Sequence, residues 1–186
     1  MLDLALMKLL LAATVRLSGL APMPVDDLPG VHTLPASDLR AQACPVDAET
    51  CANLAGWYDT LRHRILISEP FDPRSARDLS FVVHELVHVL ERRQMGERYQ
   101  ADCEATLKSE RRAYHTQNAY LQEQQAPERY GRMLLNVACA PDQPGGTGVM
   151  RLELMRQDDL TIEAFMDDYR RGRVQQADPE GRPAPR

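Results

Sequence analysis

The chain has 186 residues, and its 44% apolar and 26% charged residues are typical of a soluble globular protein rather than of a disordered chain, a collagen or a coiled-coil rod. The net charge is −5, from 22 Lys and Arg against 27 Asp and Glu, so the basic excess of nucleic-acid-binding proteins is missing and no nucleic-acid partner is expected. The length predicts a single domain, residues 1–174, followed by a polar tail over 175–186 that we expect to be disordered.

The first twenty residues are largely apolar and form the first predicted element. Asp3, Lys8 and Arg16 interrupt them, so they contain no stretch of about 18 uncharged residues that could span a bilayer. They also fit a signal peptide poorly, because the uncharged run is short and Pro22 follows the one suitable cleavage position. We therefore interpret residues 1–20 as a helix that packs on the domain, and we expect no transmembrane segment.

The next part of the chain predicts a connector, a short helix and a β-hairpin. Four prolines and two glycines make residues 19–35 an irregular connector, and a short helix is expected over 37–42. Residues 54–68 have the pattern of a hairpin, with an apolar first arm, a polar turn and a second arm over 64–67.

Helical patterns dominate the rest of the chain. Capping residues at 72–75 predict a helix that runs to about Gln94. Further helices are expected over 101–125, 127–137 and 161–171.

The helix that ends near Gln94 carries the most informative motif. Residues 81–90 are apolar except for His84, Glu85 and His88. At about 100° per residue, the two histidines lie one turn apart on the same face, with the glutamate beside them. Polar side chains on such an apolar helix need partners, because unpaired burial costs about 2–7 kcal/mol. A metal ion would satisfy both imidazoles at once.

These residues form the HExxH pattern, in which histidines at i and i+4 bind one zinc ion and the glutamate acts as general base on a water molecule. The pattern predicts one Zn2+ ion, with His84 and His88 as ligands and Glu85 as the catalytic base. Cobalt or manganese could use similar ligands. The alternative is a core helix with two satisfied histidines and a chance glutamate, in a metal-free helical interaction protein.

Helix periodicity selects a third ligand. Four side chains downstream could supply it: Asp102, Glu104, Glu110 and His115. Steps of four and three residues give a mostly apolar seam: Cys103, Leu107, Glu110, Tyr114, Gln117 and Leu121. Glu110 is the carboxylate of this seam and needs a cation there, whereas Glu104 and His115 belong to a charged row that should face water. The alternative partner of Glu110 is an arginine such as Arg62 or Arg64.

A strand, an HExxH helix and a second helix with a glutamate resemble the zincin metallopeptidases, and more narrowly the gluzincins. The chain is also similar to small uncharacterised bacterial HExxH domains with a Gly-aromatic-Tyr strand, here residues 56–58, and a Glu-x-x-Ala-Tyr-x-x-Gln helix, here residues 110–117. The resemblance covers residues 54–121. The metzincin subclass is excluded, because Glu91 and Gln94 stand where it has a glycine and a third histidine.

The resemblance implies an α+β fold, mainly helical, with a minimal zincin-like core in which a small β-hairpin packs against the HExxH helix and a second long helix. It implies that residues 64–67 form an edge strand that pairs with an extended peptide, and that Glu110 is the third ligand. We therefore expect a zinc-dependent hydrolase, a peptidase with a peptide or protein substrate. The alternative is a zinc-binding but non-hydrolytic structural or partner-binding domain.

Several other residues near the motif have two interpretations. Tyr58, Tyr114 and His115 are candidate contacts to the substrate or the transition state, and Tyr99 could also donate to an oxyanion. For each tyrosine the alternative is a core or rim aromatic. Residues 91–93 are interpreted as a solvated helix end, with its arginines placed favourably against the helix dipole.

The four cysteines form an even set without the close spacing of a structural zinc site. Three pairings are possible, and the short separation of the first two favours disulfides Cys44–Cys51 and Cys103–Cys139. The alternative is four buried thiols. Disulfides favour the periplasm or secretion, whereas the poor signal-peptide pattern argues against them.

Overall fold

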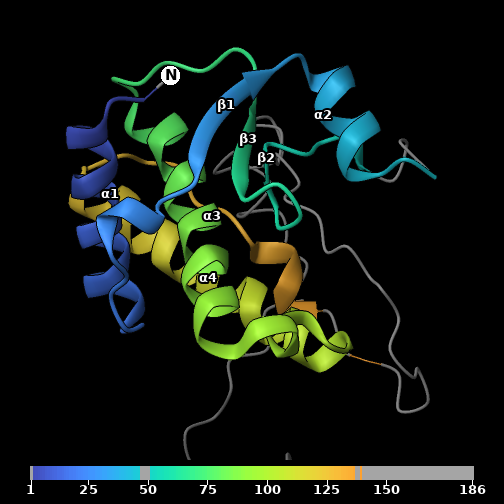
Figure 1. Ribbon diagram of the computed structural model, residues 1–186. Coiled ribbons are helices and arrows are strands. Elements are labelled where there is room, and N and C mark those ends of the chain that lie inside the picture. Colours follow the sequence, from blue (N-terminus) through green and yellow to red (C-terminus); the bar gives the residue numbers. More distant parts are fainter. Residues whose placement is uncertain (1, 47–50, 137–138, 140–186) are drawn as a thin grey trace, which may run out of the picture. The chain divides into compact units, whose positions relative to one another are not determined.

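The computed structural model describes residues 2–46, 51–136 and 139. Their helices are α1 (Leu4–Ser18), α2 (Ala36–Ala43), α3 (Ala76–Met95) and α4 (Cys103–Glu123) (Figure 1). Their strands are β1 (Gly30–Leu34), β2 (Gly56–Asp59) and β3 (Arg64–Ser68). The described residues all fall within residues 1–154, one of two compact units into which the chain divides. The helix expected over 161–171 and the tail over 175–186 lie outside the described residues.

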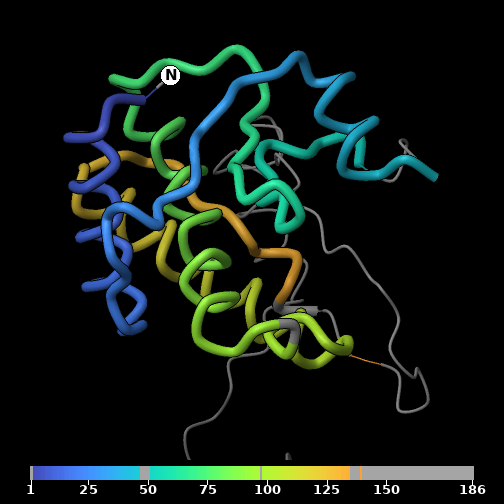
Figure 2. Tube along the Cα trace, viewed as in Figure 1, coloured from blue at the N-terminus to red at the C-terminus, as the bar shows by residue number. Residues whose placement is uncertain are grey.

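The three strands form a small mixed sheet in the order β1-β3-β2. β3 is antiparallel to β2, as the hairpin predicted, and it is parallel to β1, which lies far from it in the sequence (Figure 2). The sheet corrects two expectations, because β1 lies inside the expected connector and residues 64–67 form a central strand rather than an edge. The continuous apolar run Ile65–Ile67 is typical of a strand buried on both faces. β1 buries only Val31 and offers no such run.

A buried carboxylate holds the turn between β2 and β3. Asp59 is 1% exposed and accepts hydrogen bonds from the backbone N–H groups of Leu61 and Arg62, at 3.2 and 3.1 Å. It also forms ion pairs with Arg62 at 3.2 Å and with Arg64 at 3.0 Å. Burial raises the pKa of Asp59, but the hydrogen bonds from Arg64 and Arg62 outweigh it and lower that pKa below its ordinary value. Both arginines that were alternative partners for Glu110 are therefore paired with Asp59.

The Asp59→Asn variant is expected to lose about 1–3 kcal/mol of unfolding free energy at pH 7, because the charge-assisted hydrogen bonds weaken. Folding lowers the pKa of Asp59. The stabilisation by the Asp59 carboxylate is therefore fully present above its unfolded-state pKa of about 4, and it is lost as the pH falls through the lower native pKa. Urea unfolding of both proteins at pH 7 and pH 3 measures this. An equal difference at both pH values would contradict the role of the charge.

The long helices begin and end largely where the sequence predicted. Ser75 caps α3 by accepting from Asp78 N–H at 3.2 Å, and Asp102 caps α4 by accepting from Ala105 N–H at 2.8 Å. The predicted helices over 1–20, 37–42 and 101–125 are confirmed as α1, α2 and α4, with ends shifted by a few residues. None of the helices in the described part of the chain is long and apolar enough to cross a membrane.

The helix expected over 127–137 is wrong, because only a 3-10 helix over Arg132–Asn136 forms. Asn118 holds the preceding segment by bonding both backbone groups of Tyr130, at 2.9 Å each. Gly131 then adopts φ +80°, and a Cβ there would collide with the Tyr114 side chain. This close approach prevents a regular helix through Gly131.

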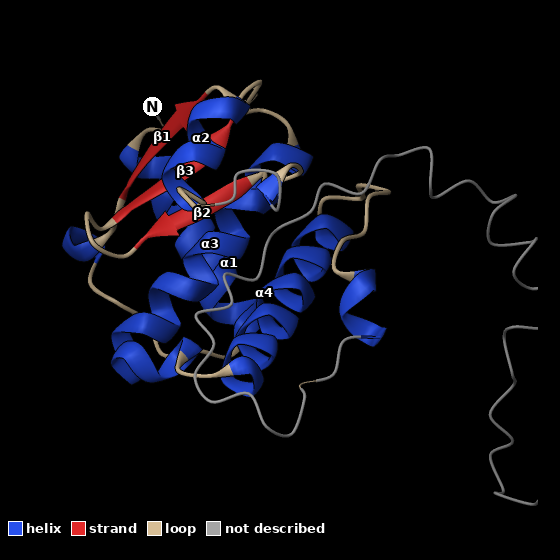
Figure 3. Cartoon of the chain, turned by 90° about the vertical axis from the view of Figure 1, so that its right-hand side faces the viewer, coloured by secondary structure: helices blue, strands red, loops and turns tan. Residues whose placement is uncertain are grey.

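α3 is the central helix of the described core. It packs against α4 along its length, α1 packs against both helices, and the sheet lies against α3 from the side of β2 and β3 (Figure 3). Every residue from Leu79 to Glu91 is buried. Polar groups on this stretch of α3 are therefore enclosed by the other elements.

Two disulfides form, and the predicted pairing is confirmed. Cys44 pairs with Cys51, and Cys103 pairs with Cys139, with Cα separations of 6.4 and 5.8 Å. The second bond ties the start of α4 to the segment that follows the 3-10 helix. Disulfides are typical of proteins from oxidising compartments.

Candidate metal site

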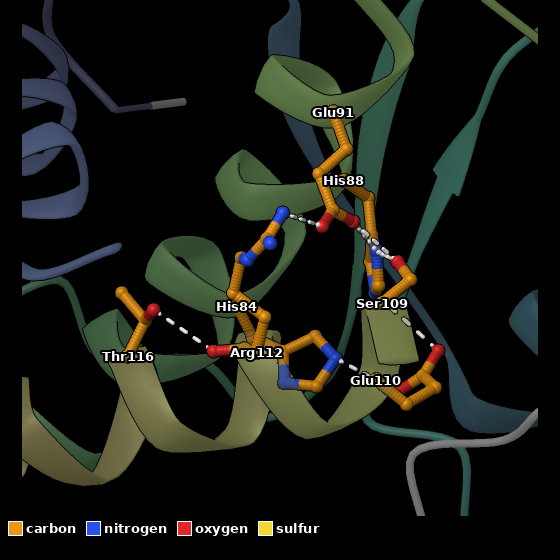
Figure 4. Close-up of polar contacts among 7 residues, drawn as sticks. All are labelled: His84, His88, Glu91, Ser109, Glu110, Arg112 and Thr116. Atoms are coloured by element: carbon orange, nitrogen blue, oxygen red, sulfur yellow. Dashed lines mark hydrogen bonds and ion pairs between the residues drawn. The ribbon is translucent and has the colours of Figure 1, made fainter. Parts of the chain in front are cut away.

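α3 and α4 bring two histidines and one glutamate together in the core. His84, His88 and Glu110 are 0%, 5% and 3% exposed. His84 Nε2 lies 3.3 Å from Glu110 Oε2, and His88 Nε2 lies 3.4 Å from Glu110 Oε1 (Figure 4). One ligand atom from each residue lies within 4.8 Å of the others. The three side chains could therefore hold one metal ion between them.

The helix phase predicted for α4 agrees with the burial of its residues. The seam residues Leu107, Glu110, Tyr114, Gln117 and Leu121 are buried. Glu104 and His115 are exposed, on a different row of the helix. The structure therefore brings Glu110 to the histidines, but it does not bring Glu104 or His115 there.

Hydrogen bonds fix which nitrogen of His84 faces Glu110. The Nδ1 atom of His84 lies 3.1 Å from Gln117 Oε1. The Gln117 amide nitrogen donates to Ser80 Oγ at 3.0 Å, and the Ser80 hydroxyl donates to the Arg77 carbonyl at 2.6 Å. Gln117 Oε1 can only accept, so His84 carries a proton on Nδ1 and Nε2 is the nitrogen that could bind a metal.

A second chain of polar contacts lies behind His88. Its Nδ1 atom lies 3.0 Å from Ser109 Oγ, and the Ser109 hydroxyl donates to Glu91 Oε2. Arg112 donates to the other oxygen of Glu91 at 2.6 Å (Figure 4). Burial raises the pKa of Glu91, but its contacts with His88, Ser109 and Arg112 lower that pKa below its ordinary value, so Glu91 is a carboxylate. His88 Nε2 is thus the nitrogen left for a metal.

Each Nε2 atom therefore turns its lone pair toward the Glu110 carboxylate. Nitrogen and oxygen are then both hydrogen-bond acceptors, and a cation has to lie between them. Among the described residues, His84 Nε2 and Glu110 Oε2 are buried without a hydrogen-bond partner. Burial raises the pKa of Glu110, but the charges and hydrogen bonds of His88 and His84 together outweigh burial and lower it to about 2. Burial lowers the pKa of His88, but its contacts with Glu110 and Glu91 and the charge of Glu85 together raise it to about 10. Without a metal, a proton on His88 is this cation. A metal ion bound here would take its place.

Glu85 lies beside this group but outside it, against strand β2. Its carboxylate accepts a hydrogen bond from the Tyr58 backbone N–H, and the side chain is 2% exposed. A Cβ on Gly56 would lie 2.9 Å from Glu85 Oε1, so the glycine makes room for the carboxylate. Burial raises the pKa of Glu85. The site therefore combines three groups that could bind a metal with a fourth, separately held carboxylate.

The sequence candidates around the site have different surroundings. The Tyr58 hydroxyl lies 2.8 Å from His63 Nδ1. The Tyr114 ring packs edge-on against the His84 ring, with the two ring centroids 4.6 Å apart. The Tyr99 ring lies 6.2 Å from that of His88, and burial and the charge of Glu85 raise the pKa of Tyr99. Tyr114 and Tyr99 thus line the group with their rings.

The interpretation of residues 91–93 as a solvated helix end is wrong for Glu91, which is 1% exposed. The steps of four and three that located Glu110 on α4 also run through His84, His88 and Glu91 on α3. This signal could have identified Glu91. Ser109 carries no comparable signal, because its contacts with His88 and Glu91 depend on how the two helices pack.

The family described as "Domain of unknown function (DUF6647)" matches residues 18–143, about two thirds of the chain. The match contains the sheet, α3, α4, both disulfides and every residue of the site. No curated protein and no solved structure matches the chain.

Proposed function

We propose that this chain, which belongs to the DUF6647 family, is a zinc-dependent hydrolase that acts on peptides. One observation carries the proposal: the two Nε2 atoms and Glu110 converge on one point, and Glu85 is held beside that point by another element. A chance HExxH sequence on a core helix gives no reason for Glu110 to meet both histidines.

The donor set supports zinc as the metal. Two imidazoles and one carboxylate are the protein ligands of many catalytic zinc sites, which keep a fourth position open. Structural zinc sites are usually closed by four protein ligands. Three ligands with a separate carboxylate therefore favour a catalytic site.

The chemistry follows from how Glu85 is held. A bound zinc ion would supply a Lewis acid that lowers the pKa of a water molecule to about 7 and polarises a carbonyl group. Glu85 then takes a proton from the attacking water while the water oxygen bonds to the carbonyl carbon of the peptide. It gives that proton to the peptide nitrogen as the C–N bond breaks. Burial, which raises the pKa of Glu85, suits a group that must both accept and return a proton.

β2 is the strand that a peptide could extend. Among the described strands it pairs with β3 alone, and the Tyr58 N–H points away from β3 to Glu85. Its outer edge therefore faces the site, and an extended peptide could add to it by hydrogen bonds to backbone groups of β2 other than the Tyr58 N–H, which Glu85 occupies. We therefore propose residues 56–59, in place of residues 64–67, as the substrate-binding edge.

One observation favours the second candidate, a zinc-binding domain without hydrolytic activity. His84, Glu85, His88 and Glu110 are each at most 5% exposed, and a substrate carbonyl has to reach them. A metal that only stabilises the core needs no such access.

Metal analysis with a hydrolysis assay tests the proposal. The purified wild-type protein is expected to hold about one zinc ion per chain, the His84→Ala variant to hold almost none, and only the former to cleave unfolded casein. A chelator should abolish cleavage and added zinc should restore it. Zinc without cleavage would favour the non-hydrolytic domain, and a wild-type protein that binds no zinc would overturn both.

The Gly56→Ala variant should cleave the substrate about 100-fold more slowly while keeping its zinc. The new Cβ would displace the Glu85 carboxylate, and a misplacement of about 1 Å can cost this much. Measurements of kcat and bound zinc test this. Gly30→Ala on β1 is the control, because its Cβ would meet the exposed His32 side chain. Equal activity of Gly56→Ala and wild type would contradict the position assigned to Glu85.

A further inference from the structure

We propose that Ser109 and Glu91 are positioning residues that fix the proton of His88 on Nδ1. In this arrangement Arg112 holds Glu91 in place, so that Glu91 accepts the hydroxyl proton of Ser109. The inference rests on the proposed function, because its consequence is how strongly His88 binds zinc. It concerns a buried carboxylate and a buried hydroxyl that the hydrolytic reaction itself does not use.

The count of protons supports this role. A serine hydroxyl has one proton, and Ser109 gives it to Glu91. Ser109 Oγ can therefore only accept from His88, so the proton of His88 stays on Nδ1 and Nε2 is left to bind the metal. His88 Nδ1 lies 3.8 Å from Glu91 Oε2, too far for a direct hydrogen bond. The serine is thus the group that connects the two.

The position of these residues couples the two helices that carry the ligands. Glu91 lies on α3, three residues after His88, and Ser109 lies on α4, directly before Glu110. Glu91 and Ser109 are 1% and 2% exposed, so bulk water does not compete for either contact. Arg112 reaches Glu91 from α4 and neutralises its charge.

The contacts that link His88 through Ser109 to Glu91 and Arg112 are called the relay below. The two histidines are held differently, which gives this relay a specific effect. His84 is backed by the neutral amide of Gln117, whereas His88 is backed through Ser109 by a carboxylate. A carboxylate behind a metal-binding histidine fixes the ring orientation and raises its basicity, and loss of such a partner weakens metal binding about 10- to 100-fold. We therefore expect the zinc affinity of the site to fall when a polar partner of His88 is removed, by more than the loss of packing alone would cause.

Zinc affinity of two variants and a control tests the relay. Ser109→Ala removes the acceptor of the Nδ1 proton, and its zinc Kd should rise about 10- to 100-fold in competition with a chromophoric chelator. In Glu91→Gln the amide can donate to Ser109, whose hydroxyl can then donate to His88 and allow the wrong tautomer; its zinc Kd should rise about tenfold. Thr116→Val is the control, because this buried α4 hydroxyl donates only to the Arg112 carbonyl.

Proton NMR of the zinc-loaded proteins adds a readout that packing does not move. The wild type and Thr116→Val should show a slowly exchanging Nδ1–H signal of His88, and Ser109→Ala should lose it. Unchanged zinc Kd in Ser109→Ala, or an equal rise in Thr116→Val, would overturn the relay while the proposed function stands. A wild-type protein that binds no zinc would overturn the proposed function and the relay with it. Should Ser109→Ala not fold, Glu91→Gln decides alone by the same two measurements.

Discussion

The Glu85→Gln variant is expected to keep about one zinc ion per chain and to lose about 100- to 10,000-fold in kcat. Glutamine keeps the shape of the side chain and can still accept from the Tyr58 N–H, so the fold and the ligand group stay intact. It cannot take a proton from water, so under the proposed function the reaction would lose its general base. Zinc content and kcat, measured on the same preparation, give both halves of this result.

The matched control for this change is Glu104→Gln, which removes the charge of an exposed glutamate on α4. It should behave as the wild type in both measurements. Loss of zinc in Glu85→Gln would make Glu85 a ligand instead of the base. Unchanged kcat in that variant would remove the catalytic role and favour a metal site without hydrolysis.

The features that sequence predicted well depend on residues close together along one helix. The apolar character of residues 81–90 identified α3 and made its three polar groups stand out. The spacing of four residues then placed the two histidines on the same face of the helix. The same periodicity separated Glu110 from Glu104 on α4. On α4 the face toward the core is set by the local apolar pattern. α3 is buried all round from Leu79 to Glu91, and there the spacing of the motif alone brings the two histidines together, so no knowledge of the partner helix was needed.

The features that sequence missed depend on pairing between distant segments. β1 has one buried valine, and only its parallel contact with β3 makes it a strand. That contact also moves residues 64–67 from the edge to the centre of the sheet. The role of Ser109 likewise arises from the packing of α4 on α3, which places its hydroxyl between His88 and Glu91.

The comparison of Glu110→Ala with Glu104→Ala tests the third ligand. Glu110→Ala should weaken zinc binding by at least about 100-fold, more than the loss of a group behind a ligand, while Glu104→Ala should leave the zinc Kd unchanged. Glu110 supplies the negative charge between the two Nε2 atoms, at 3.3 and 3.4 Å, and Glu104 is exposed on a different row of the same helix. Chelator competition measures both constants.

Glu110→Gln separates the loss of a ligand from the loss of packing. The amide fills the same space but lacks the charge that balances a divalent cation, so its zinc Kd should also rise strongly while its melting temperature without metal changes less than that of Glu110→Ala. If Glu110→Gln bound zinc as the wild type does, Glu110 would contribute packing and not coordination. If Glu104→Ala lost zinc and Glu110→Ala kept it, the face assigned to α4 would be wrong, because Glu110 is on the buried face of the helix and Glu104 is on its exposed face.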